Sequence, residues 1–303
     1  MKHKPIAEQV IVVTGASSGI GLCTALVAAE RGARVVLLAR SAGALDAIVE
    51  TIRAEGGQAD ALCVDVSARD EVDAAVVSVL ERHGRIDTWV NNAGVSIYGR
   101  LDEVDERDSR RLFDINFWGM VNGSLAALPA LKASNGVLVN MGSEASEAVL
   151  PLQGMYAASK HAVKGFTDAL RVEQERVDDA PLSIVLIQPT AVNTPYPQHA
   201  RNYMDSEPKL PDPQIDPHRV AGAILDAAQK GGRDIKVGAM SHLNTTTSAL
   251  LPRLGDRLAA KQATRQQHDA PPQRPQGTLF EAGGGAQVYG TDDDGEVIAG
   301  RSA

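Results

Sequence analysis

A tyrosine and a lysine four positions apart are well placed in this chain for acid–base chemistry. Tyr156 and Lys160 lie in a segment with helical patterning, where residues four apart share one face, one turn from each other. A tyrosine has a pKa of about 10 in water, and a nearby cation can lower the pKa of an acid by about 1–3. Lys160 can therefore help Tyr156 to move a proton near neutral pH.

A serine follows a run of strand-forming residues shortly before this pair. Ser143 comes directly after the run Gly136–Met141, so its hydroxyl is expected at the end of a buried strand. There it could hydrogen-bond a carbonyl oxygen and hold it against Tyr156. Taken singly, a helical tyrosine or lysine and a turn serine are more often ordinary surface residues. Their combination predicts proton transfer to or from an oxygen.

The glycines of Thr14–Gly21 lie between a strand-like run and a helical segment near the start of the chain. Helix N-termini offer unpaired N–H groups and the positive end of the helix dipole, which suits a pyrophosphate. Gly15 permits the tight turn, Gly19 lets the backbone approach the phosphates, and Gly21 lets the helix pack on the strand. This context favours a dinucleotide-binding loop over a purely structural turn.

Seven apolar runs of strand length alternate with helical patterns over residues 1–242. The runs are continuous, which indicates strands covered on both faces. Strand–helix–strand alternation predicts an α/β fold: a Rossmann-type, doubly wound, mostly parallel seven-stranded sheet with helices on both faces. Ligands of such sheets bind at the carboxyl ends of the strands. The expected strands are Val10–Thr14, Arg34–Ala39, Ala59–Val64, Thr88–Asn91, Gly136–Met141, Leu182–Gln188 and Asp234–Val237.

These motifs together resemble the short-chain dehydrogenase/reductase family. Thr14–Gly21 matches the family's cofactor loop, and Asn91–Gly94 resembles its Asn-Asn-Ala-Gly segment after the fourth strand. Asn116, Ser143, Tyr156 and Lys160 occur in the family's order and spacing. The resemblance runs from about residue 8 to residue 240. It predicts an oxidoreductase that transfers a hydride between a nicotinamide and a carbonyl or secondary alcohol.

The resemblance also implies roles for individual residues. Tyr156 would be the acid/base, Lys160 would lower its pKa and bond the ribose hydroxyls, and Ser143 would orient the carbonyl. Asn116 would hold a water in a proton relay to Lys160. Asp65 resembles the family's acidic residue on the adenine side of the cofactor, although a surface aspartate before a turn is an almost equally good interpretation. The expected cofactor-binding residues are Gly15, Ser17, Ser18, Gly19, Ile20, Arg40, Asp65, Val66, Asn92, Ala93, Gly94, Tyr156, Lys160, Pro189, Val192 and Thr194.

One segment departs from the family pattern. After the sixth strand the family usually shows Pro-Gly, whereas this chain has Pro189-Thr190. Thr190 cannot easily take the positive φ that glycine allows. The Val192 backbone and the Thr194 hydroxyl can still reach a carboxamide, but the path of the loop does not follow from the sequence.

The end of the second strand predicts the choice of cofactor. Dinucleotide enzymes often place an acid there to hold the ribose 2′-hydroxyl. Here Ala39 occupies that position and Arg40 follows it. A guanidinium can bond a 2′-phosphate, which favours NADP(H) over NAD(H), although Arg40 could instead be solvated.

The segment Pro195–Pro217 carries six prolines and no clear periodicity, where the family keeps a mobile substrate lid. Tyr196, Tyr203 and Met204 are candidates for an apolar wall, and Glu144 and Gln153 for the pocket. None of them identifies the substrate.

Residues 243–303 differ in character from the predicted catalytic domain, residues 1–242. Leu243–Gln267 could form a helix interrupted by Pro252 and Gly255, and residues 269–303 suggest a flexible or loosely docked tail. Leu279–Phe280 and Val288–Tyr289 could pair as a small hairpin, which is marginal on its own and would have to lie on the main domain or on a neighbouring subunit.

Composition narrows the class of protein. The net charge is −8 with no basic run, which argues against nucleic acid as a partner. Two cysteines make no disulfide framework, and no apolar stretch reaches membrane-spanning length, so a soluble cytoplasmic protein is expected. His83, His161 and His199 have no metal-ligand spacing, and no metal is expected.

The main hypothesis is therefore an NADP(H)-dependent dehydrogenase/reductase acting on a small molecule as a homodimer or homotetramer. The family forms such oligomers through helices that resemble Asp105–Ala133 and Tyr156–Val177. Two alternatives remain: a cofactor-sensing regulator of the same fold, which would tend to lack Tyr156 or Lys160, and an epimerase or dehydratase, which would normally need a larger domain after the sheet.

Overall fold

Seven parallel strands form the centre of the molecule in a computed structural model that describes residues 3–290. Their order in the sheet is β3-β2-β1-β4-β6-β7-β9. Successive strands are added on one side of β1 up to β3 and on its other side from β4 onwards, so the strand order reverses between β1 and β4. Their bounds are β1 Val10–Thr14, β2 Arg34–Ala39, β3 Gln58–Cys63, β4 Thr88–Asn91, β6 Val137–Met141, β7 Ser183–Pro189 and β9 Asp234–Val237. The predicted doubly wound fold is confirmed, and each strand lies within a residue or so of its expected position.

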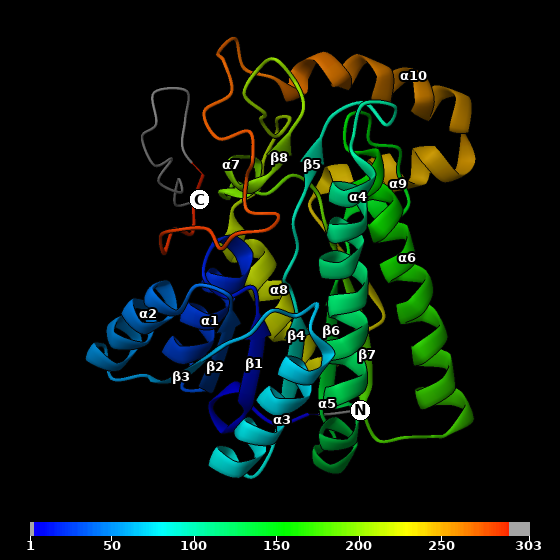
Figure 1. Ribbon diagram of the computed structural model, residues 1–303. Helices are drawn as coiled ribbons and strands as arrows, with labels where there is room; N and C mark the ends of the chain where they lie inside the picture. The colour runs from blue at the N-terminus through cyan, green and yellow to red at the C-terminus, as the bar shows by residue number, and fades with distance from the viewer. Residues whose placement is uncertain (1–2, 291–303) are drawn as a thin grey trace.

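Helices cover both faces of the sheet (Figure 1). Five of the strands are buried along almost their whole length, because apolar side chains pack on each face. The helices packed on one face are α1 Gly19–Glu30, α2 Ala42–Ala54 and α8 Pro217–Lys230. Those on the other are α3 Arg69–His83, α5 Gly119–Ser134 and α6 Gly154–Arg171.

Two helical segments contain wider turns than the sequence suggested. The expected helix Asp105–Ala133 consists of α4 (Glu106–Phe113), a π-helical turn at Asp114–Trp118, and α5. The helix after Tyr156 likewise ends in a π-helical turn, Val172–Val177. Such turns insert an extra residue per turn and often occur at functional sites. The first of them contains Asn116.

Smaller elements gather beyond the carboxyl ends of the strands. Leu251 separates two helices, because the residue before a proline is disfavoured in the helical region. Pro252 therefore begins a helix, where the sequence suggested that it interrupts one, and Gly255 lies inside that helix. The elements are β5 Ile97–Tyr98, paired with β8 Arg201–Asn202, the turn Glu144–Ser146, α7 Tyr196–His199, α9 Ala239–Leu250, α10 Pro252–Gln262 and the turn Ala263–Gln266.

The C-terminal segment crosses the carboxyl edge of the sheet, where Figure 1 draws it in orange and red above α1. Leu279 is fully buried there. Within residues 269–290 neither apolar cluster belongs to a strand, so the hairpin that the sequence allowed does not form in this part of the chain. Residues 291–303, which include the acidic run Asp292–Asp294, lie outside the described residues.

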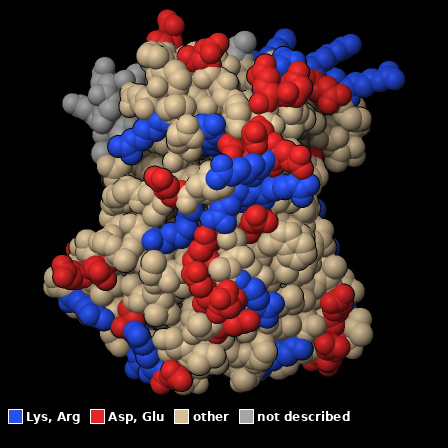
Figure 2. Space-filling view, in the orientation of Figure 1, with Lys and Arg blue, Asp and Glu red and all other residues tan. Residues whose placement is uncertain are grey.

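No helix within residues 3–290 is long and apolar enough to cross a lipid bilayer. Figure 2 shows acidic and basic side chains interspersed on the face that it draws. Both cysteines are free thiols: Cys23 is buried and Cys63 is exposed.

Candidate active site

One cavity of about 260 Å³ lies at the carboxyl edge of the sheet, beside the reversal between β1 and β4. Pockets in doubly wound folds are expected at this point, because loops from neighbouring strands diverge there. All sixteen residues expected to bind a cofactor line it, and so does Ser143. Asn116 does not line it but lies buried behind the segment that follows β4.

The glycine loop joins β1 to α1 with the geometry that a dinucleotide needs. Gly15 and Gly19 have φ of +64° and +55°, values that L-residues rarely adopt. A Cβ on Gly21 would collide with the Gly15 carbonyl, so this glycine does let the helix pack against the loop. A Cβ on Gly19 would lie 3.2 Å from the Thr194 Cβ atom. Gly19 is thus closely approached by the loop after β7.

Asn92 holds the glycine loop against the end of β4. Its Nδ2 donates to the carbonyls of Thr14 and Gly15, at 3.0 and 3.2 Å. The Thr14 hydroxyl in turn accepts the N–H groups of Asn92 and Ala93. Asn92 therefore acts on the shape of the site through the backbone.

Lys160 is buried one turn beyond Tyr156 in α6. Its Nζ donates to the Met141 carbonyl at 2.8 Å and lies 5.6 Å from the centre of the Tyr156 ring. Burial lowers the pKa of this ammonium to about 8. A group kept charged against a desolvation penalty is a common sign of function.

The pKa of Tyr156 is shifted upwards in the protein alone. Burial raises its pKa, and hydrogen bonding with Ser143 and Tyr196 only partly opposes that effect. In the protein alone, desolvation outweighs the other influences on this pKa. That Lys160 lowers the pKa of Tyr156 together with the positive nicotinamide of the oxidised cofactor stays a prediction. At neutral pH Tyr156 therefore keeps its proton and is suited to act as an acid.

Ser143 is held by a local hydrogen bond, and Asn116 by hydrogen bonds to residues distant in the sequence. The Ser143 Oγ accepts the Ala145 N–H at 3.1 Å, which caps the turn Glu144–Ser146. Asn116 Nδ2 donates to the Val95 carbonyl and to Ser159 Oγ, and its Oδ1 accepts the Val95 N–H. Asn116 thus joins the segment after β4 to α6, one residue before Lys160.

Thr190, which stands where glycine was expected, does not have a positive φ. Gly238 takes φ of +97° nearby, and a Cβ there would lie 2.6 Å from the Thr190 methyl carbon. The Thr190 hydroxyl donates to Glu144 Oε2 at 3.1 Å, and Asn244 donates to the same oxygen at 2.9 Å. Gly238 therefore makes room for the Thr190 side chain, which stands where the family usually has glycine. The Thr190 hydroxyl in turn holds the Glu144 carboxylate in place. Burial raises the pKa of Glu144 although both hydrogen bonds oppose it.

The substrate side of the cavity is lined partly as expected. Tyr196 packs edge to face on Tyr156, with 5.5 Å between ring centres, and donates to Gln153 at 2.8 Å. Tyr203 and Met204 do not line the cavity; the Tyr203 hydroxyl bonds Asp108 instead. Sequence reasoning missed several lining residues, because nothing in their types marks them: Ser96, Leu150, His199, Leu210 and Pro211.

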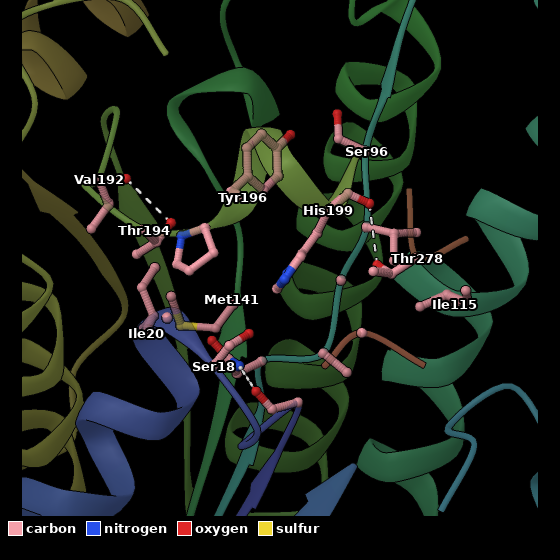
Figure 3. Close-up of a pocket in the computed structure, with 18 of the residues that line it drawn as sticks. Ser18, Ile20, Ser96, Ile115, Met141, Val192, Thr194, Tyr196, His199 and Thr278 are labelled. Atoms are coloured by element: carbon pink, nitrogen blue, oxygen red, sulfur yellow. Dashed lines mark hydrogen bonds between the residues drawn. The ribbon is translucent and has the colours of Figure 1, made fainter. Parts of the chain in front are cut away.

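Arg40 and Asp65 lie at the other end of the cavity. The Asp65 carboxylate, partly buried, accepts bonds from Arg111 at 2.6 Å and from Ser67, which hold its pKa below the ordinary value. Arg40 donates to the backbone carbonyls of four consecutive residues, 278–281. The residues Thr278 and Ala282–Gly285 also line the cavity, which the sequence did not indicate. Figure 3 shows Thr278 beside His199, to whose carbonyl it donates.

The doubly wound fold and the glycine loop define a dinucleotide-binding protein of the Rossmann type. The short chain dehydrogenase family model matches residues 9–204, and the chain belongs to this family. It is 40% identical over 297 residues to the uncharacterized oxidoreductase YxnA of Bacillus subtilis, covering 96% of this chain and 83% of that protein.

Two solved structures with bound cofactors are similar. A short chain dehydrogenase/reductase from Burkholderia phymatum in complex with NAD has a TM-score of 0.71 and 27% identity, covering 89% of this chain and 99% of that one. An alcohol dehydrogenase from Thermococcus sibiricus, complexed with 5-hydroxy-NADP, has a TM-score of 0.66 and 27% identity, covering 76% and 94%. These two similar structures thus hold one cofactor of each type, NAD and an NADP derivative.

Proposed function

We propose that this chain is an NADP(H)-dependent carbonyl reductase or secondary-alcohol dehydrogenase. The observation that carries the proposal is the buried Lys160 ammonium, bonded to the Met141 carbonyl, one helical turn from Tyr156 and in the same cavity as Ser143 and the glycine loop. When bound, the nicotinamide supplies or accepts the hydride. The glycine loop, Asn92–Gly94, Pro189, Val192 and Thr194 are the residues that would hold it.

The chain's own residues supply the proton. In the reducing direction the Ser143 hydroxyl donates to the substrate carbonyl oxygen and orients it. Tyr156, protonated at neutral pH, gives its proton to that oxygen as the carbonyl carbon receives the hydride. Lys160 places a positive charge beside the tyrosinate that results, and Asn116 keeps the segment after β4 in register with α6.

The choice of NADP(H) rests on the end of β2. Ala39 leaves no carboxylate there to repel a 2′-phosphate, and Arg40 lines the cavity. Arg40 also bonds carbonyls of residues 278–281. A phosphate can compete with these carbonyls, because it carries the opposite charge and can accept two parallel hydrogen bonds from one guanidinium.

A substrate screen tests the activity. Purified protein should oxidise NADPH with at least one class among ketones, aldehydes and quinones, as measured by loss of the reduced-nicotinamide absorbance. Protein that neither oxidises nor binds NADPH or NADH would contradict the proposal. Binding without turnover on any class would favour the regulatory alternative.

We expect the enzyme to be a cytoplasmic homo-oligomer. The free thiols suit a reducing compartment. Large apolar side chains are exposed on the helices of the expected interface: Trp118, Leu125, Val172 and Val177. Covering them against a second copy would stabilise an assembly. Light scattering at micromolar concentration should give a mass above that of one 32.0 kDa chain.

A further inference from the structure

Residues 278–290, here called the strap, cross the mouth of the cavity and are fixed at both ends. At one end Leu279 is fully buried in the core between the sheet and the layer of α3, α5 and α6. At the other end Val288 packs against the core between the sheet and the layer of α1, α2 and α8. The Tyr289 ring stacks on the His218 ring. The Gly290 N–H donates to Asn193 Oδ1. The strap therefore spans the cavity from one helical layer to the other.

Between these ends the strap is bonded to groups of the predicted cofactor site. The Arg40 guanidinium donates to the Thr278 carbonyl at 2.5 Å and to the three carbonyls that follow at 3.3–3.4 Å. Arg111, which binds Asp65, also donates to the Leu279 carbonyl. The Gly19 N–H, at the first residue of α1, donates to the Gln287 carbonyl at 2.8 Å. The strap is thus attached to β2, α4 and the glycine loop.

The strap encloses the cavity without filling it. Ala282–Gly285 line the same space as the glycine loop, Tyr156 and Lys160. A Cβ built on Gly284 or Gly285 would meet no atom within 4 Å, so the chain does not require glycine there to avoid its own packing. Gly285 has φ of +91°. Consecutive glycines are suited to a backbone that passes close to a ligand.

From this arrangement we propose that the strap is a wall of the cofactor site: residues Thr278–Gln287 enclose the bound dinucleotide and must lift before it can exchange. The inference rests on the proposed function, since it takes the ligand of the cavity to be NADP(H). Arg40 is then a positioning residue for the strap as well as a ligand of the 2′-phosphate. Slow release of the cofactor follows, because dissociation requires the strap's bonds to Arg111 and Gly19 to break first.

Truncation tests the proposal on the binding step alone. A chain ending at Gly277 lacks the strap, and a chain ending at Gly290 keeps it and serves as the matched control. NADPH dissociation is followed by stopped-flow fluorescence during displacement by excess NADP⁺. We expect release to be at least about tenfold faster without the strap, with weaker binding, as the loss of one or two hydrogen bonds implies. The control should behave as the full chain. Unchanged release, or tighter binding without the strap, would overturn the proposal; tighter binding would make the strap an inhibitor.

Because the shorter chain also loses buried Leu279, a second measurement uses the intact protein. Hydrogen exchange is compared with and without NADPH for peptides covering residues 14–21 and 278–290. Protection of both peptides supports enclosure under the strap. Protection of the glycine loop with faster exchange in the strap would show that the cofactor displaces the strap, and would overturn the inference alone. Protection of neither peptide would overturn the proposed function, and the strap's role with it.

Discussion

At one end of the cleft, side chains on regular elements form the proposed catalytic group, whereas at the other end an irregular segment is held through its backbone. Tyr156 and Lys160 are placed by one helix, and Ser143 by the turn after β6. The strap, in contrast, offers carbonyl oxygens to Arg40, Arg111 and Gly19. The first arrangement depends on residue type and spacing, and the second depends almost entirely on where the chain runs.

The largest expected effect is on turnover and comes from a substitution at the end of the cleft that holds Tyr156. Tyr156→Phe removes the proton donor while keeping the ring that packs on Tyr196, so turnover should fall by at least about 10²-fold with cofactor binding retained. Steady-state kinetics and NADPH titration measure the two quantities. Tyr203→Phe is the control, because that hydroxyl bonds Asp108 outside the cavity. Near wild-type turnover in Tyr156→Phe would rule out the mechanism.

The next effect concerns the strap end. Arg40 should favour NADP(H) over NAD(H) by about 10- to 100-fold, as expected for a charge-assisted bond of roughly 1.5–3 kcal/mol. Ala39→Asp should reverse that preference, because its carboxylate would repel a 2′-phosphate and accept a 2′-hydroxyl. Dissociation constants for both cofactors measure the ratio. Equal constants in the wild type would refute the role of Arg40.

The dependence on pH separates the two groups of the catalytic end. The pKa of Lys160 is about 8 and that of Tyr156 is raised by burial, so both are protonated at neutral pH. For carbonyl reduction, kcat/KM for the cofactor should be flat below pH 8 and fall above it, as Lys160 loses its charge. Lys160→Arg, which keeps a cation at higher pH, should be slower but should not show that fall. A fall at the same pH in both proteins would assign it to another group.

Comparison of these regions also explains what the sequence could predict. Buried parallel strands are continuous apolar runs, so the strand positions and the fold followed from the pattern. The Tyr–Lys pair followed from helical spacing. The strap did not, because its contacts use carbonyls that every residue has. The raised pKa of Tyr156 did not follow either, because desolvation depends on how the site is buried. Nor did the role of Gly238, which makes room for Thr190 from another loop.

The smallest expected effect is on stability and follows from the buried charge of Lys160. Its folded-state pKa of about 8 lies below the ordinary value of 10.5, so the unfolded chain binds more protons between these values. Burial of the charged lysine therefore costs stability below pH 8, and this cost disappears as the pH rises towards 10.5. Lys160→Met removes the cost and loses the bond to the Met141 carbonyl, so the free energy of unfolding at pH 7 should rise by about 1–2 kcal/mol.

The sign of this effect can be checked within one helix. Lys164, one turn further along α6, is bonded to Asp168 at 3.0 Å and lies near Glu147 and Asp234. Lys164→Met should therefore leave stability unchanged or lower it. Urea unfolding of both variants and the wild type at pH 7 and pH 10 gives the comparison. The advantage of Lys160→Met should shrink at pH 10, because the wild-type lysine is then neutral in the folded protein. A variant less stable than the wild type at pH 7 would mean that Lys160 is structural, and that its burial is not a cost carried for the chemistry of Tyr156.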